Sequence, residues 1–248
     1  MNSGSKVYIG TSGFAYDHWK GVFYPEKLPA PVRFHYYSRR MNSVEINSTF
    51  YRTPSPECFS KWHHSTPDNF SFVLKGSRFI THYHKLKVTT NYLTRFLNPT
   101  GNLKNKLAAV LWQLPPDLSP DIEILEKFLV NLSPFRNCSH FFEFRNPLWY
   151  NNEISSLLNK HNATRCCSDW QDLPFDLTQE NQVKPQYIRL HGPSGAAYCD
   201  SYRQSFLETL AQKIIDNCNH KINTYIFFNN DIGGHAIKNA QTLMKILS

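Results

Sequence analysis

Acidic and basic side chains that can move protons stand inside apolar runs of this sequence. Glu45 and Glu143 each lie among β-branched or aromatic residues, and His191 follows a similar run. Strands buried on both faces are normally apolar throughout, so charged residues within them need a functional or a structural reason. We predict that Glu45 and Glu143 form a general acid and base pair, and that His191 transfers a proton.

Basic residues in the same kind of run indicate an anionic ligand. Lys75, Arg145 and Arg189 suit a phosphate or a carboxylate, because an Arg guanidinium can bind either group through two parallel hydrogen bonds. Further candidates for ligand binding are polar or small residues at the ends of these runs: Thr11, Ser12, Asn47, Gln113, Asp169 and Asn230.

A structural interpretation of the same charges stays open. Glu143 and Arg145 are two residues apart on one predicted strand and can neutralise each other. Glu45 and Lys75, on neighbouring strands, can do the same. Burying many charges only for structure is costly, however, which favours a functional cluster.

A divalent metal is the weaker hypothesis for this cluster. Glu45, Glu143, Asp169 and His191 are ligand types that metals accept. The sequence has no HExxH pattern or close His/Asp spacing, and three nearby cations oppose metal binding. We therefore assign no residue to a metal site and name no cofactor, and a bound divalent metal stays the weaker alternative.

Two loops are candidate lids. The segment from Gly13 to Pro31 is rich in aromatic residues, including Tyr16 and Trp19, and a second loop from Gly192 carries Tyr198. Such residues suit stacking on bases or sugars. A loop that packs on itself is the equal alternative.

Apolar, β-branched runs alternate along the chain with helical periodicity, which predicts an α/β fold with parallel strands and crossover helices. About eight such units in 248 residues favour a single (β/α)₈ TIM barrel over residues 1–248, because barrels of this class occupy about 250 residues. Catalytic groups then gather at the carboxyl ends of the strands. The predicted strands are 7–13, 43–49, 70–77, 107–114, 140–145, 163–168, 186–192 and 222–230.

Apolar residues at three- and four-residue steps predict the helices between these strands. The clearest helix runs over 121–132 after Pro120, and helices are also expected over 54–62, 151–161, 200–218 and 235–247. The segment 172–185 lacks this periodicity and is expected to be irregular.

The composition is that of a folded protein, with 41% hydrophobic and 19% charged residues. The net charge of +8 favours an anionic or polyanionic partner, although Lys and Arg are dispersed along the chain. No apolar stretch is long enough to cross a membrane and the first residues are polar, so we expect a cytoplasmic protein without a membrane partner. The six cysteines lack a CxxC pair and are expected to be reduced, mostly buried thiols. The oligomeric state is left open.

Seven segments, in order, resemble the YecE-like family, known as domain of unknown function 72 (DUF72). They are GTSGFAYDHW (10–19), VEINSTFYR (44–52), FVLKGSR (72–78) with Thr81 and His82, LWQLPP (111–116), EFR (143–145), RLHG (189–192) and FNN (228–230). The family usually has Trp where this chain has Phe14, a conservative aromatic exchange. The resemblance implies a TIM barrel and implies no settled reaction.

The resemblance also supplies an alternative function. The family's barrel is similar to those of xylose isomerase and endonuclease IV, which makes DNA phosphodiester chemistry an analogy. The sequence thus leaves open an enzyme with a small anionic ligand, a nucleic-acid binding or repair protein, and a non-enzymatic ligand sensor.

Overall fold

The computed structural model of the protein describes residues 4–175, 177, 185–195 and 197–248. The chain forms two compact units. The first contains residues 1–45 and 167–248, and the second contains residues 46–166. Strand β2 (Ser43–Ile46) spans the border between them. One undivided domain over residues 1–248 stays a prediction.

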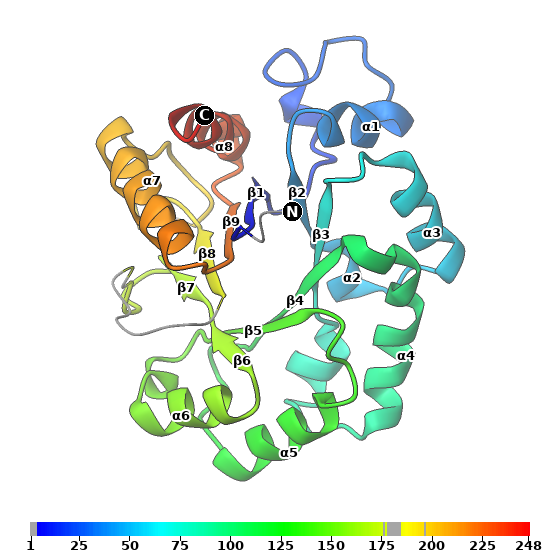
Figure 1. The fold of residues 1–248 in the computed structure, drawn as a ribbon, viewed down its shortest axis with the longest axis vertical. Helices are drawn as coiled ribbons and strands as arrows, with labels where there is room; N and C mark the ends of the chain where they lie inside the picture. Colours follow the sequence, from blue (N-terminus) through cyan, green and yellow to red (C-terminus); the bar gives the residue numbers. More distant parts are fainter. Residues whose placement is uncertain (1–3, 176, 178–184, 196) are drawn as a thin grey trace. The chain divides into compact units, whose positions relative to one another are not determined.

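The first unit is built on a parallel sheet of order β1-β9-β8-β7. Its strands are β1 (Val7–Thr11), β9 (Thr224–Phe228), β8 (Gln186–Leu190) and β7 (Cys167–Ser168). Helices α7 (Gln204–Asn219) and α8 (His235–Ile246) pack beside this sheet, and the short α1 (Arg33–Ser38) precedes β2 (Figure 1).

Buried aromatic rings fill the interior of the first unit. Tyr37 is fully buried, and its hydroxyl accepts the backbone N–H of Thr11 and donates to the carbonyl of Ser43. A Cβ at Gly10 would lie 2.1 Å from that same Ser43 carbonyl oxygen, so only glycine permits this close approach. The contacts of Tyr37 and Gly10 thus hold the end of β1 close to Ser43.

The second unit places strands β3 (Ser71–Lys75), β4 (Leu107–Gln113), β5 (Ser139–Glu143) and β6 (Ala163–Arg165) side by side in that order, all parallel. Helices α3 (Pro56–Ser65), α4 (Thr90–Thr100), α5 (Ile122–Leu132) and α6 (Asn152–Lys160) lie along one side of these strands (Figure 1). The four-residue helix α2 (Ser48–Tyr51) follows β2 directly.

Capping residues explain where several helices of the second unit begin. The side chains of Asp121 and Asn151 accept backbone N–H groups of the first turns of α5 and α6. Ser55 does the same for α3, with Pro56 in the first helical position. The buried stripe of α5 packs into a core around Trp112, whose ring is fully buried and meets Phe96 and Phe128. This core holds the helices against the strands.

The prediction of an α/β fold with parallel strands and intervening helices is confirmed. All eight predicted strands have a counterpart. Seven of them end earlier than expected, and 163–168 ends as predicted but is interrupted at Cys166 into β6 and β7. The predicted strand 43–49 is wrong beyond Ile46, because the chain turns into α2 and Thr49 is helical. Helix α4 was not predicted. Within the predicted irregular segment, residues 176 and 178–184 lie outside the described residues.

One-turn helices complete the connections: η1 (Asp17–Trp19), η2 (Ala30–Val32), η3 (Phe79–Tyr83), η4 (Gly101–Lys106), η5 (Pro147–Trp149) and η6 (Ile232–Gly234). All six cysteines are free thiols; Cys166 and Cys167 are buried and the others are half-buried. Among the described residues, no helix has the length and apolar character needed to cross a membrane.

Candidate functional site

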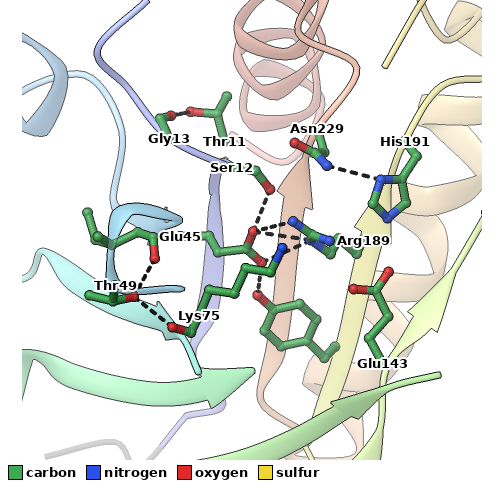
Figure 2. Close-up of polar contacts among 12 residues, drawn as sticks. Thr11, Ser12, Gly13, Glu45, Thr49, Lys75, Glu143, Arg189, His191 and Asn229 are labelled. Atoms are coloured by element: carbon green, nitrogen blue, oxygen red, sulfur yellow. Dashed lines mark hydrogen bonds and ion pairs between the residues drawn. The ribbon is translucent and has the colours of Figure 1, made fainter. Parts of the chain in front are cut away.

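A fully buried carboxylate, that of Glu45, organises the strand ends of the first unit (Figure 2). Arg189 forms an ion pair with it, with Nη2 2.8 Å from Oε1 and Nε 3.1 and 3.2 Å from the two oxygens. Ser12 donates its hydroxyl to Oε1 over 2.7 Å, and Tyr187 donates to Oε2 over 2.5 Å. Both oxygens of Glu45 therefore accept hydrogen bonds from fixed donors.

The strand pleat explains why these donors converge. Tyr187 and Arg189 are two residues apart on β8, so their side chains point to the same face. Ser12 directly follows β1 and forms a bridge with Glu45. Arg189, which we predicted to bind the ligand, is thus engaged by Glu45, and this arrangement favours a positioning role for Glu45 over proton transfer.

His191 follows β8 directly and is 2% exposed. Its Nδ1 lies 3.0 Å from the side-chain amide nitrogen of Asn229. The ring stands edge-on to Trp170, at 5.1 Å between centroids, and 5.9 Å from Tyr198. The backbone N–H of His191 donates to Asp169 over 2.6 Å.

Asp169 fixes the loop that follows His191. Its second oxygen accepts a very short hydrogen bond from the hydroxyl of Tyr202, which in turn accepts the backbone N–H of Gly192. Burial and the neighbouring Asp169 raise the pKa of Tyr202, so its hydroxyl stays protonated. Gly192 has a φ of 127°, and a Cβ there would lie 2.2 Å from the carbonyl oxygen of Cys199, so the turn requires glycine.

A cavity of about 810 Å³ opens beside this loop, entirely within the first unit. Asp169 and Tyr202 line one part of it, Gly192 to Gly195 another, and Arg203 with Ser205 at the start of α7 a third. Helix α7 begins with Arg203 as N-cap and has no acidic residue in its first turn. This wall is therefore positive in character.

A second buried network follows β9. The amide nitrogen of Asn230, fully buried, donates to the carbonyl of Asp200 and to Asn239. The neighbouring Asp231 accepts the indole N–H of Trp19 over 2.7 Å and pairs with His18 over 2.8 Å. Burial raises the pKa of Asp231, while His18 opposes that shift.

The aromatic loop after β1 packs largely on itself. Trp19 is 0% exposed and makes ring contacts with Tyr16, Phe23 and Tyr24, which leaves no free face for a ligand. Tyr16 donates its hydroxyl to the carbonyl of Ser12, and burial raises its pKa. For Trp19, the structure supports the alternative that the loop packs on itself rather than covering a ligand.

Two other residues predicted at the site, Tyr198 and Thr11, differ from each other in exposure. Tyr198, predicted as a lid, is 40% exposed, and its ring contacts that of Trp170 in a tilted arrangement, at 5.6 Å between centroids. Thr11, predicted to bind ligand, is fully buried and donates its hydroxyl to the carbonyl of Gly13.

The second unit holds the remaining predicted residues. Glu143 and Arg145 form a buried ion pair of 2.8 Å, as the structural interpretation expected. Gln113 ends β4 directly beside Glu143 in the strand register. Lys75 ends β3 with its ammonium 4.4 Å from the centre of the Phe50 ring. Asn47 precedes α2, whose Thr49 hydroxyl lies 2.7 Å from the carbonyl oxygen of Lys75 (Figure 2).

The structure thus shows two groups of predicted residues, one in each unit, and their union in a single site stays a prediction. Sequence reasoning missed Tyr187, Asn229, Tyr202, His18 and Asp231. Strand alternation could have found Tyr187, two residues before Arg189. The others stand on loops or, for His18, in the one-turn helix η1, where no periodicity marks them. Among the described residues, no three His, Cys, Asp or Glu side chains are grouped as metal ligands.

Comparisons with known proteins identify the family. The family model "Protein of unknown function DUF72" matches residues 8–248. The UPF0759 protein YunF of Bacillus subtilis is 25% identical over 97% of this chain and 94% of its own length. The UPF0759 protein YecE of Escherichia coli is 30% identical over 51% of this chain and 44% of its own length.

Solved structures agree with this relationship. A DUF72 family protein of Thermotoga maritima has a TM-score of 0.83 and 28% identity, over 98% of this chain and 99% of its own. A DUF72 family protein of Enterococcus faecalis, 20% identical with a TM-score of 0.80 over 97% of this chain and 95% of its own, shares the fold. The resemblance found in seven sequence segments is confirmed, and the chain belongs to the DUF72 family.

Proposed function

We propose that the first unit binds a small anionic ligand, one that carries a phosphate or a carboxylate, in the cavity beyond β7 and β8. The observation that carries this proposal is the wall formed by Arg203 and the start of α7. A ligand at this place lies beyond the carboxyl ends of parallel strands, where α/β folds keep their chemistry.

The start of α7 offers hydrogen-bond donors and positive potential. The first N–H groups of a helix have no acceptor within the helix, and an Arg side chain at the N-cap cannot accept them. The dipole of this sixteen-residue helix adds to the charge of Arg203. Ser194 and Ser205 supply hydroxyl donors on the same cavity lining.

Two acidic residues line the cavity, Asp169 and Asp200, and neither strongly opposes the binding of an anion there. Both oxygens of Asp169 accept hydrogen bonds, one from the His191 backbone and one from Tyr202. Such donors compensate much of a carboxylate's charge. Asp200, also on the lining, is exposed and therefore screened by solvent.

His191 is the residue that we propose for proton transfer to or from the ligand. Asn229 fixes its ring, and the adjacent Gly192 lines the cavity. Glu45 positions Arg189 beside it on β8. A proton-transfer role of this kind suits hydrolases, isomerases and lyases alike.

Calorimetric titration with inorganic phosphate, small sugar phosphates and dicarboxylates tests the ligand class. Arg203→Ala should weaken binding about tenfold or more, because a hydrogen bond to a charged group is lost. Arg136→Ala is the matched control: it removes an exposed Arg of the second unit, whose Nε donates to the carbonyl of Ser133 just after α5. No binding by the wild type, or equal losses in both variants, would refute the proposal.

Nucleic-acid binding is the second candidate function. The net charge of +8 favours it, and so does an exposed surface of the second unit with aromatic and basic residues. Affinity for DNA or RNA should then fall steeply between low and physiological salt.

A further inference from the structure

Exposed aromatic rings and half-buried basic side chains of the second unit lie in the segments that follow strands β2 and β3. We call this set the aromatic–cation surface and define it as Tyr51, Arg78, Phe79, Tyr83, His84 and Tyr92. Tyr51 and Tyr83 are 66% and 65% exposed, and Phe79 is 40% exposed. Large aromatic side chains are usually more buried than this, so the surface calls for an explanation.

The Arg78 guanidinium joins the two exposed tyrosines. Its central carbon lies 5.2 Å from the ring centre of Tyr51 and 5.4 Å from that of Tyr83. Among the described residues, no carboxylate lies within ion-pair distance of Arg78. Its charge is therefore available to an anion outside the protein.

A second group of rings continues the surface. Phe79 contacts His84 at 4.3 Å and Tyr92 at 5.3 Å between centroids, and His84 also contacts Tyr92. The guanidinium of Arg95 lies 5.9 Å from the centre of the Tyr92 ring. Rings and cations thus alternate along the surface.

Buried neighbours hold this surface in place. Thr49, within α2, is fully buried and its hydroxyl contacts the carbonyl of Lys75. The one-turn π-helix η3 is anchored by buried Ile80 and Thr81. The backbone that carries Tyr51 and Tyr83 is therefore held in place before a partner binds, which lowers the cost of ordering it on binding.

The chain segment that follows β3 is basic. No Asp or Glu occurs between Asp68 and Asp117, whereas Arg78, Lys85, Lys87 and Arg95 lie between β3 and the end of α4. Asp117 itself is paired with Lys85 at 2.7 Å. The partner is therefore expected to be an anion with flat groups that stack.

We propose that the aromatic–cation surface binds single-stranded nucleic acid. Unpaired bases stack on exposed rings without sequence preference, and Lys and Arg contact the phosphates. In a duplex the bases already stack on each other, so it cannot use these rings in the same way. This surface is distinct from the cavity proposed for the small ligand, which lies in the first unit.

Fluorescence anisotropy with a labelled single-stranded oligonucleotide of about 15 residues, as DNA and as RNA, tests the proposal. The Tyr51→Ala/Tyr83→Ala variant should lose about tenfold or more in affinity, whereas Tyr51→Phe/Tyr83→Phe keeps the rings and should bind nearly as the wild type does. Arg78→Ala should also weaken binding. Arg40→Ala is the matched control, because it removes a guanidinium stacked at 3.5 Å on Tyr36 in the first unit.

Each other outcome contradicts the proposal. Absence of binding at low salt would overturn it. Equal binding of single strands, duplex and heparin, with no effect of the Tyr→Ala changes, would show a general attraction of polyanions. A surface used by a protein partner would show no oligonucleotide binding. Arg203→Ala should leave oligonucleotide binding unchanged, so failure here and failure of the proposed ligand cavity can be told apart.

Discussion

The polar cluster of the first unit and the aromatic–cation surface of the second unit both follow the carboxyl ends of parallel strands, but they differ in exposure. Glu45 and Arg189 are at most 1% exposed, and Glu45 accepts hydrogen bonds from three residues. Tyr51 and Tyr83 are about two thirds exposed. Buried charges must satisfy one another within the fold, whereas exposed rings and cations keep capacity for a partner. We therefore expect substitutions in the first region to change mainly the stability of the fold, and substitutions in the second to change mainly the binding of a partner.

Removing one partner of the buried ion pair should have the largest effect on stability. Arg189→Met leaves Glu45 buried without its cation, which should lower the free energy of unfolding by about 3–5 kcal/mol. The double variant Glu45→Met/Arg189→Met removes both charges and should recover much of this loss. Urea denaturation followed by circular dichroism measures both. A loss below about 1 kcal/mol for the single variant would show that the Glu45–Arg189 ion pair contributes little to the stability of the fold.

The pH dependence of stability should reveal the buried Asp231. Because burial raises its pKa, Asp231 stabilises the fold most below the ordinary pKa of an aspartate, and this contribution is lost as pH rises through its folded-state pKa. Asp231→Asn does not titrate, so its stability relative to the wild type should rise with pH in the acidic range. Urea denaturation at several pH values measures the difference. A difference that falls with pH would be contrary to this prediction.

The smallest effect on stability is expected at the exposed surface. Arg78→Ala removes a guanidinium that contacts only exposed rings among the interactions described for it, and should change the free energy of unfolding by less than about 0.5 kcal/mol. The same denaturation experiment checks this. A loss comparable with that of Arg189→Met would show that the surface is structural, and the contrast between the two regions would disappear.

The sequence by itself determined the α/β class, the positions of the strands along the chain and the family. Apolar periodicity is a local property, so it identifies β8 and α5 without knowledge of their neighbours. It also identified Glu45, Arg189 and His191 as unusual, because a charge inside an apolar run is visible in the sequence. The ion pair of Glu143 with Arg145 was equally predictable, since the two residues are two positions apart.

Only the tertiary structure decided which groups meet. Glu45 and Arg189 are separated by 144 positions, and no local pattern distinguishes Arg189 from Lys75 as the partner of Glu45. Trp19 donates its indole N–H to Asp231 near the other end of the chain. Tyr51 in α2 and Tyr83 in η3 contact the same guanidinium, that of Arg78. Pairings of this kind arise from packing over long sequence separations, which periodicity within one segment does not encode.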